Sequence, residues 1–342
     1  MDTPSSASVV PRRVWTTLGE PALRTVAKIA AVGASGARVQ ERVQLILDEL
    51  RTVVPYQAVM LAGRDPVSGR TRRVVQSGYP ARLSEYMIGE GFRTEMTEPF
   101  ARSMPGWPVR ECDLPMDPMS LRSIAEHLRP AGYPEGLLMT LTADDDRDVG
   151  FLIMSVDDAR TPPSDEAITS IGHVAALLGN LVDPLGEARR LASVLGEEQT
   201  AVAILPNGTT EPLQGAAPPE LLDRGSRLRL AADRLARGRS ADTPFTWLDD
   251  EGAWYRCRLL RCRDGILVLT MTGCEQRHRL TRRELEVLTH LAAGSTNDEI
   301  AAELVVTTRT VRAHVERVME KLAVGSRSGA VARAIREGLL IP

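Results

Sequence analysis

Residues 307–322 read TTRTVRAHVERVMEKL and decide the fold of the C-terminal part of this chain. At about 100° per residue, the apolar side chains of this stretch fall on a single helical face. They are Val311, Val315, Val318 and Leu322. The opposite face carries Arg309, Arg312, Arg317, Glu316 and Glu320. The sequence therefore predicts an amphipathic helix with a mostly basic outer face, in a chain whose 45 acidic residues outnumber its 42 basic ones.

Three further helices are predicted around this one. Residues 281–284 and 296–299 both have the Thr-x-x-Glu spacing of a capping box, in which the two side chains cap backbone amides reciprocally. Gly294 ends the first of these helices, and Ser326 begins a fourth helix after the basic one. Only a short link around residues 305–307 separates the second helix from the third. We therefore predict an all-α four-helix domain at residues 281–342.

A short link between two helices, the second of them basic, is the arrangement that places a helix in the major groove of DNA. Free amides and Thr hydroxyls at the N-terminal end of that helix would meet phosphates, and Arg side chains would reach phosphates or guanine edges. An ordinary solvated helix is the alternative, because Glu316 and Glu320 share the exposed face. Charge alone leaves both interpretations open.

Residues 280–340 resemble the LuxR-type, or GerE-like, helix-turn-helix along their whole length. The motifs LTRRELEVL, NDEIAAEL, TVRAHV and KLAVGSR stand in the order and spacing of that family. The resemblance implies a bacterial regulator of double-stranded DNA, with base contacts from Arg312, Ala313 and Glu316. It implies phosphate contacts from Thr308 and Thr310. With the remaining basic side chains, the predicted DNA-binding set is Thr308, Arg309, Thr310, Arg312, Ala313, Glu316, Arg317 and Lys321.

Two residues depart from the family pattern. Many relatives carry a basic or amide residue at the position of Glu316, whose carboxylate either accepts a hydrogen bond from cytosine or repels the DNA backbone. Gly329 replaces the acid often found early in the last helix. The base sequence that is recognised is therefore not predicted.

The pattern of residues 21–186 predicts one α+β unit. An apolar stripe at helical spacing predicts a helix over residues 38–54, which Pro55 stops. Strands are predicted at 56–63 and 70–79, joined by a turn at 65–69, and at 136–143 and 148–156, joined by the acidic turn 144–147. The irregular stretch between these strand pairs contains a predicted helix at 120–128, and a long helix begins at Ser164.

The long helix has two open interpretations. Its apolar residues alternate steps of three and four, which is the spacing of a heptad seam. They are Ile168, Ile171, Ala175, Leu178, Val182 and Leu185. The helix either closes over its own sheet or forms the interface of a homodimer.

The pattern of turns and apolar runs in residues 187–272 predicts a second, smaller α+β unit. A hairpin at 201–213 turns around residues 206–208, helices follow within 219–238, and strands are predicted at 244–250, 252–262 and 265–273. No repeat connects this unit to the first at the level of sequence. The polar segment 273–280 reads as a linker to the helical domain, and residues 1–20 read as a flexible N-terminus.

The order of these elements suggests two further resemblances. Residues 37–183 resemble a GAF domain, and residues 187–272 are similar to a degenerate PAS domain. Such domains imply a sensory or dimerising role, with a small-molecule effector or a protein partner as the signal. The predicted fold is thus multi-domain, with GAF-like and PAS-like α+β sensory domains before the four-helix domain.

Candidate chemistry is sparse elsewhere. Cys112, Cys257, Cys262 and Cys274 form no CxxC pair and no zinc spacing, so we expect reduced thiols. Cys112 lacks the adjacent His of a nucleophile, and residues 144–146 are explained by a hairpin turn rather than by a metal. His127, His173 and His314 are expected to pack, as are Tyr79, Trp107 and Tyr133. We expect no enzyme activity, no cofactor and no metal.

Length and composition limit the class of protein. At 342 residues the chain exceeds one ordinary core, and 43% hydrophobic with 25% charged residues is typical of globular proteins. No apolar run has the length of a membrane span, and the N-terminal MDTPSSASVVPRRVW lacks the apolar core of a secretory signal. We expect a cytoplasmic, homodimeric transcription regulator. The alternatives are an acyl-homoserine-lactone receptor and an enzyme-derived N-terminal region fused to the DNA-binding domain.

Overall fold

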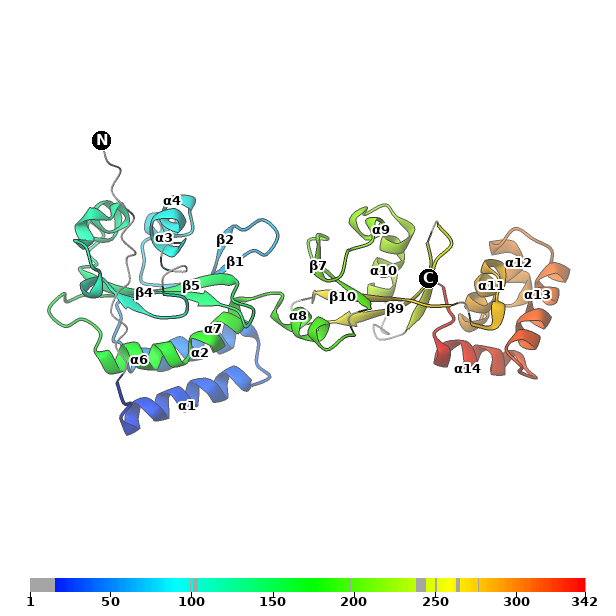
Figure 1. The fold of residues 1–342 in the computed structure, drawn as a ribbon, viewed down its shortest axis with the longest axis horizontal. Coiled ribbons are helices and arrows are strands. Elements are labelled where there is room, and N and C mark those ends of the chain that lie inside the picture. The colour runs from blue at the N-terminus through cyan, green and yellow to red at the C-terminus, as the bar shows by residue number, and fades with distance from the viewer. Residues whose placement is uncertain are drawn as a thin grey trace. The chain divides into compact units, whose positions relative to one another are not determined.

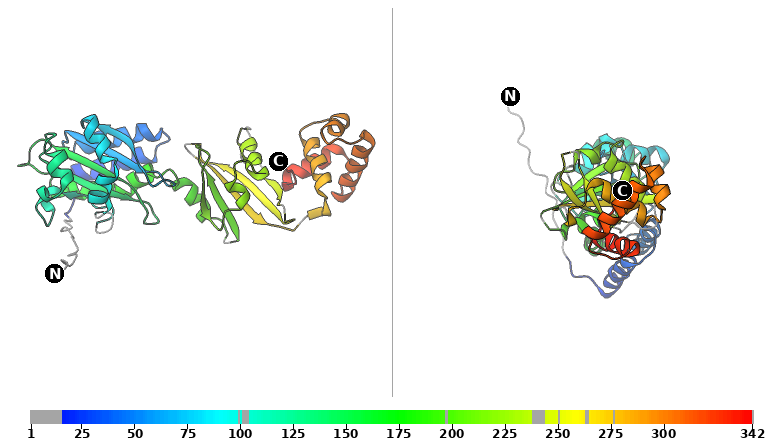
Figure 2. Two further views of the ribbon diagram at one scale, coloured as in Figure 1. Left: turned by 90° about the horizontal axis from the view of Figure 1, so that it is seen from above. Right: turned by 90° about the vertical axis from the view of Figure 1, so that its right-hand side faces the viewer.

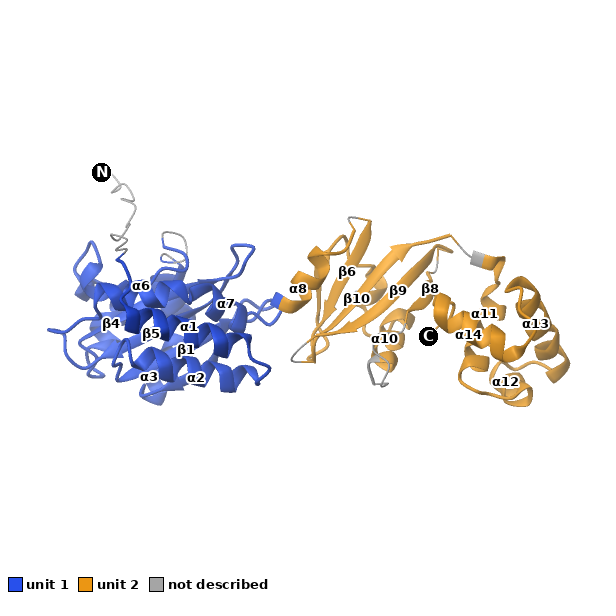
Figure 3. Ribbon diagram, turned by 90° about the horizontal axis from the view of Figure 1, so that it is seen from below, with its two compact units in different colours: residues 1–186 blue, residues 187–342 orange. Residues whose placement is uncertain are grey.

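The computed structural model divides the chain into two compact units, Met1–Gly186 and Glu187–Pro342 (Figure 3). It describes residues 16–341, except for 99, 101–103, 197, 238–243, 250, 263–264 and 276. Among the described helices, none is both long and apolar enough to span a bilayer. The two units are treated separately below.

The first unit is built on a five-stranded antiparallel sheet. Its strands are β1 (Ala58–Arg64), β2 (Thr71–Ser77), β3 (Val109–Arg110), β4 (Glu135–Thr142) and β5 (Asp148–Val156). Their order across the sheet is β2-β1-β5-β4-β3. The central strand β5 pairs Leu152 with Leu61 on one side and with Met139 on the other. The two strand pairs predicted from sequence are therefore confirmed.

Helical layers cover both faces of this sheet (Figure 1). One face carries α2 (Val39–Arg51), α6 (Asp165–His173) and α7 (Ala175–Val182), with α1 (Glu20–Ala34) packed outside them. The other face carries α3 (Ala81–Met87), α4 (Glu90–Phe92) and the π-helical segments Arg93–Thr97 and Ser123–Leu128. The short 3₁₀ turns Glu111–Asp113 and Pro118–Ser120 connect this layer. Burial on both faces accounts for the almost unbroken burial of β1, β4 and β5.

The long helix predicted from Ser164 is two helices, and its seam faces inward. Val174 leaves the helical conformation at φ −102° and ψ 2°, between α6 and α7. A Cβ on Gly179 would lie 2.3 Å from the carbonyl oxygen of Thr142, so α7 packs directly against β4. All six seam residues are buried, and the first five belong to the apolar core of this unit: Ile168, Ile171, Ala175, Leu178, Val182 and Leu185. The structure therefore favours packing within the unit over a dimer seam.

The N-terminal expectation is partly wrong. Residues 1–15 lie outside the described residues, but residues 16–19 are held in place. The Thr16 amide donates to Thr169 Oγ1 at 3.3 Å, and the Gly19 amide donates to the Glu166 carboxylate at 2.7 Å. The helix α1, which begins at Glu20, was not predicted from the sequence.

The second unit repeats the strand order of the first. Its strands are β6 (Gln199–Ile204), β7 (Thr210–Gln214), β8 (Phe245–Leu248), β9 (Trp254–Arg261) and β10 (Leu267–Gly273). They are ordered β7-β6-β10-β9-β8, and every neighbouring pair is antiparallel. In both sheets the first strand lies beside the second and the fifth. The common topology was not visible in the sequence.

The second sheet is buried on both faces along most of β6 and β10, whereas β9 is covered on one face. α9 (Pro219–Leu222) and α10 (Arg227–Arg237) pack on it through a core that includes Val202, Leu228, Cys257 and Leu269. α8 (Gly186–Ser193) lies near one end of the sheet, on the side away from α10 (Figure 1). Along β9 the side chains alternate, with Arg256 and Arg258 exposed and Cys257 and Leu259 buried. We call the face that bears Arg256 and Arg258 the outer face.

Four helices complete the second unit, at the orange-to-red end of the chain (Figure 2). They are α11 (Arg282–Ala292), α12 (Asn297–Glu303), α13 (Thr308–Lys321) and α14 (Arg327–Glu337). Both capping boxes are present, at Thr281 with Glu284 and at Thr296 with Glu299. The all-α four-helix prediction is confirmed. A single apolar core joins the helices, through residues such as Leu288, Ile300, Val311 and Ala334.

Candidate DNA-binding surface

The third helix of the bundle presents its basic face outward. Val311, Val315 and Val318 are buried against the other helices, as the spacing predicted. Arg309, Arg312 and Arg317 are exposed, and Ala313 is half-buried. Within the described part of the chain none of these three arginines forms an ion pair. Their guanidinium groups are therefore available for an external anion.

The N-terminal end of α13 is organised by threonines. Thr307 Oγ1 accepts the Thr310 amide at 3.2 Å and lies 2.9 Å from Thr310 Oγ1. Thr308 Oγ1 donates to Asp298 Oδ1 at 2.7 Å, which joins α12 to the start of α13. Because helix N-termini carry partial positive charge, this end favours a phosphate. The Thr308 hydroxyl, however, already has an internal partner, so its first role here is to orient the helix.

Lys321 differs from the other predicted contacts. Its ammonium donates to Glu284 Oε2 at 2.6 Å and to the Arg279 carbonyl at 2.8 Å. Burial raises the pKa of the Glu284 carboxyl, but hydrogen bonds from Lys321 and the Thr281 amide outweigh it, so the net pKa is lowered. Lys321 therefore neutralises a buried carboxylate inside the domain, and its contact with DNA stays a prediction.

The turn between α12 and α13 contains an unusual residue that sequence reasoning missed. Val305 has φ 54° and is 88% exposed. A β-branched side chain at positive φ is strained, so the fold imposes this conformation on the turn. Glu316, which differs from the family pattern, is exposed as well and lies next to Arg317 on the same helix. A carboxylate therefore stands within the basic face.

The helical bundle is attached to the second sheet at the edge strand β8. The Thr246 amide donates to the Leu340 carbonyl and the Thr246 hydroxyl to the Gly338 carbonyl, each at 2.7 Å. Trp254 of β9 packs against the apolar core of the bundle. The C-terminal end of α14 therefore rests on the sheet. We call these contacts the joint.

The segment that leads into the bundle combines a strained backbone with a side-chain contact to α14. His278 and Arg279 both have positive φ, at 63° and 51°. His278 Nε2 lies 2.7 Å from a carboxylate oxygen of Glu337, and this hydrogen bond lowers the Glu337 pKa. The predicted linker 273–280 is thus part of the joint rather than a free tether.

The interior of the first unit holds the predicted aromatic residues in its core. Tyr79, Trp107 and Tyr133 are all buried, and Tyr79 packs edge-to-face on Tyr133 with ring centroids 5.0 Å apart. The cavity between β4, β5 and the helices above them has a volume of about 20 Å³. A space of that size holds about one water molecule, whereas small-molecule sites have roughly 300–1,000 Å³. The prediction of core packing is confirmed for these three residues.

Buried carboxylates line the same region. Arg129 Nη2 donates to Glu111 at 2.7 Å, and the Glu111 amide donates to Glu135 at 3.0 Å. Burial raises the pKa of Glu111 to about 7, against the attraction of Arg129, and burial also raises the pKa of Glu135. Sequence reasoning missed this pair, because nothing in the spacing of the two residues indicates that they meet.

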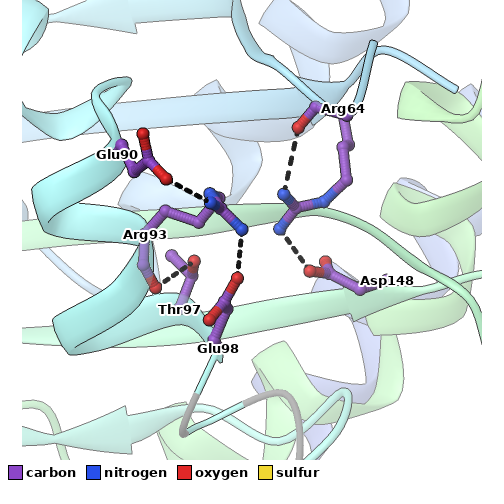
Figure 4. A network of polar contacts seen from close by, with 7 residues as sticks. Arg64, Glu90, Arg93, Thr97, Glu98 and Asp148 are labelled. Atoms are coloured by element: carbon purple, nitrogen blue, oxygen red, sulfur yellow. Dashed lines mark hydrogen bonds and ion pairs between the residues drawn. The ribbon is translucent and has the colours of Figure 1, made fainter. Parts of the chain in front are cut away.

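Two groups of polar contacts lie near each other, one on the sheet and one in its helical cover (Figure 4). Arg64 of β1 pairs with Asp148 of β5, and Arg93 pairs with Glu98 and, at 3.1 Å, with Glu90. Three carboxylates thus accompany two guanidinium groups. These residues carry no excess positive charge for an anionic ligand. The Arg64 pair joins β1 to β5, and the Arg93 pairs lie within residues 90–98.

The remaining candidate residues have ordinary surroundings. All four cysteines are free thiols, Cys257 buried and Cys112 exposed. His127 stacks on Tyr86 with ring centroids 3.5 Å apart. Residues 144–146 form the tight turn between β4 and β5, closed by the Ala143 amide on the Arg147 carbonyl. Among the described residues, no three acidic, His or Cys side chains are grouped so as to hold a metal ion.

Comparison with known proteins places the helical bundle in a family. Residues 278–334 match the bacterial regulatory proteins of the luxR family. The spore germination protein GerE of Bacillus subtilis is 46% identical over 61 residues, which are 18% of this chain and 82% of GerE. The probable transcriptional regulatory protein NarL of Mycobacterium tuberculosis is 51% identical over 61 residues, 18% of this chain and 28% of NarL. The matched region thus spans less than a third of NarL.

Solved structures also align with the upstream region. The Escherichia coli protein SdiA aligns with 94% of this chain and 99% of its own, at 17% identity and a TM-score of 0.35. Isolated GAF domains align with 48–52% of this chain, at 12–17% identity and TM-scores of 0.33–0.37.

Proposed function

This chain belongs to the luxR family of bacterial regulatory proteins, and we propose that α13 reads the major groove of an operator while the upstream units control that binding. The observation that carries the proposal is a set of exposed arginines that form no ion pair with any residue that the structure describes, opposite a buried valine face. They are Arg309, Arg312 and Arg317. Such side chains make bidentate contacts to guanine or charge-assisted contacts to phosphate.

The DNA-reading part is tested with full-length variants. An operator is first selected from random duplexes, and Arg312→Ala is compared with Arg336→Ala, an exposed arginine of α14. We expect Arg312→Ala to cost about 1–3 kcal/mol and to relax specificity at one base position. Arg336→Ala should leave specificity unchanged. If the two variants bind all duplexes alike, α13 does not read the groove.

Control by the upstream units is supported by the joint. An α14 that rests on β8 cannot move freely, so any change in the sheet that alters this contact changes the freedom of the bundle. A signal can shift such an equilibrium only by binding one arrangement more tightly than the other. We therefore propose two arrangements of the bundle, docked on the sheet and released from it. No reaction is part of the proposal.

A homodimer on two half-sites is part of the proposal as well. Helix-turn-helix proteins commonly match their two-fold symmetry to paired half-sites. The inward seam of α6 and α7 no longer supports a dimer, whereas Leu23 of α1 and Leu45 of α2 are about half exposed. Sedimentation of the full chain, alone and on the selected operator, tests this. Monomer in both states would exclude the dimer.

A further inference from the structure

A hydrogen bond between two side chains joins the two helices of the helix-turn-helix. Thr308 Oγ1, at the start of α13, donates to Asp298 Oδ1 of α12 at 2.7 Å. The two residues lie on either side of the turn at 305–307. Asp298 is exposed and Thr308 is half-buried, so the contact lies at the surface of the bundle. The contact therefore holds the first turn of α13 in a defined place relative to α12.

This contact occupies the hydrogen-bond donor of Thr308. A threonine hydroxyl has one hydrogen to donate, and here Asp298 accepts it. A phosphate oxygen needs a donor, so in this arrangement the Thr308 hydroxyl has none left for DNA. The first backbone amides of α13 have no acceptor within the helix. Phosphate contacts at this end therefore fall to those amides, as they do at other helix N-termini.

Asp298 also places a negative charge beside the end of α13 that is proposed to face DNA. The next acid of α12, Glu299, uses its carboxylate to accept the Thr296 amide at 2.6 Å in the capping box. Asp298, by contrast, forms no ion pair with any residue that the structure describes. Two like charges about 4 Å apart in water change a binding constant by about fivefold. The Asp298 carboxylate therefore weakens phosphate contacts at this end, whatever the base sequence.

We propose that Asp298 is a positioning residue for DNA reading, with two separable effects. Its hydrogen bond to Thr308 orients α13 so that Arg312 meets the base edges, which raises the preference for the operator. Its charge opposes the phosphates, which lowers the affinity for all duplexes alike. Because non-specific binding comes almost entirely from phosphate contacts, net affinity then depends more on the bases. The inference rests on the proposed reading of the major groove by α13.

Three full-length variants separate the two effects, on the selected operator and on a scrambled duplex. Asp298→Asn keeps an oxygen acceptor for Thr308 but removes the charge. Both affinities should then rise by up to about fivefold at low salt, with their ratio unchanged and a salt slope that steepens by up to about one unit. Asp298→Ala also removes the hydrogen bond, and Thr308→Val removes the hydrogen bond alone. In both of these variants the ratio of operator to scrambled affinity should fall by about two- to tenfold.

Glu303→Gln is the matched control for the charge. It removes the same charge from another exposed position of α12, about 140° away around the helix. It should change both affinities by less than Asp298→Asn does, and equal effects would assign the change to net charge and overturn the role of Asp298. Asp298→Asn and Thr308→Val are both close in shape to the wild type, so the test does not depend on the folding of Asp298→Ala.

The same assay shows which idea fails. Unchanged affinities in Asp298→Asn, or an unchanged ratio in Thr308→Val, overturn the proposal. If Thr308→Val lowers both affinities equally, its hydroxyl binds phosphate and does not position the helix. If Arg312→Ala relaxes specificity while the Asp298 variants match the wild type, only this inference is wrong. If Arg312→Ala leaves specificity unchanged, the reading of the groove by α13 is wrong, and the role of Asp298 falls with it.

Discussion

The two sheets of this protein share one strand order but differ in how they are covered. In the first sheet β5 reads DVGFLIMSV, and every residue after Asp148 is buried. In the second sheet β9 reads WYRCRLLR, and its side chains alternate between the core and the outer face. A strand buried on both faces becomes continuously apolar, whereas a strand with one open face alternates. The two sheets therefore differ along β9, whose outer face is open, whereas β6 and β10 of the second sheet are buried over most of their length, as β5 is in the first.

The spaces beside the two sheets follow this difference. The cavity against the first sheet has about 20 Å³, and a groove on the outer face of the second has about 620 Å³. The small cavity against the first sheet is lined by buried apolar side chains such as Met96, Leu138 and Ile153, so a ligand at that place would have to displace them. In the second unit β9 exposes the outward side chains Arg256 and Arg258, close to Trp254, which packs on the DNA-binding bundle. This contrast locates the expected point of control in the second unit.

Truncating one leucine in each sheet would test the contrast most strongly. Leu152→Ala opens a cavity in β5, where Leu152 is fully buried, and should destabilise the first unit by about 2–5 kcal/mol. Leu260→Ala on the partly covered outer face should cost the second unit roughly 1 kcal/mol. Hydrogen exchange followed by peptide mass spectrometry reports the two units separately. Equal costs would mean that the outer face is buried in solution.

Many helix starts and strand pairs of this fold could be predicted from local sequence. The capping boxes at Thr281 and Thr296 use residues three positions apart, so they specify helix starts without tertiary information. The strand pairs were found from turns such as 65–69 and 144–147. Helix α1 was missed, although Pro21 just inside its start is a known signal of a helix N-terminus.

The pH dependence of stability should separate the first unit from the helical bundle. Burial raises the pKa of Glu111 to about 7, so the folded first unit holds this proton more tightly than the unfolded chain does. The contribution of Glu111 is therefore fully present below about pH 4.5 and is lost as pH rises toward 7, by about 1–3 kcal/mol. Calorimetry between pH 4.5 and 8 should show this loss, and Glu111→Gln should reduce it. An unchanged profile in Glu111→Gln would assign the pH dependence to other groups.

The contribution of Glu284 to the stability of the bundle has the opposite pH dependence. Its pKa is lowered overall, because hydrogen bonds from Lys321 and the Thr281 amide outweigh burial. Its contribution is therefore present above the ordinary carboxyl pKa and is lost in acid. Lys321→Met removes the cation and leaves the buried carboxylate underpaired, so the bundle should lose roughly 1–2 kcal/mol at pH 7. If the role of Lys321 is its pairing with Glu284, specificity should be unchanged, whereas a relaxed specificity would assign Lys321 a contact with DNA.

The misplaced residues show what a single sequence cannot specify. The apolar stripe of α6 and α7 has the spacing of a coiled coil, because a helix on a sheet and a helix on a partner need the same stripe. The spacing identifies the apolar face of the helix, but it does not identify the sheet or the partner helix that buries this face. Likewise, Lys321 shares a basic helix with Arg312, but its partner Glu284 lies 37 positions away in the chain. Pairings of this kind depend on the tertiary fold.

The smallest expected effect is the loss of one hydrogen bond at the joint. The joint pairs the edge strand β8 with the chain that follows α14. Thr246→Val keeps the shape of the side chain but removes the hydroxyl that donates to the Gly338 carbonyl at 2.7 Å. One such hydrogen bond contributes about 0.5–1.5 kcal/mol, so exchange should speed up in residues 338–341 by up to roughly tenfold. Thr210→Val on the opposite edge strand β7 is the matched control and should leave these amides unchanged. If docking restrains the bundle, Thr246→Val should also raise operator affinity by a few-fold, because a larger fraction of molecules is released. Faster exchange without any change in affinity would show that the joint forms but does not restrain DNA binding, which would contradict the proposed control through docking.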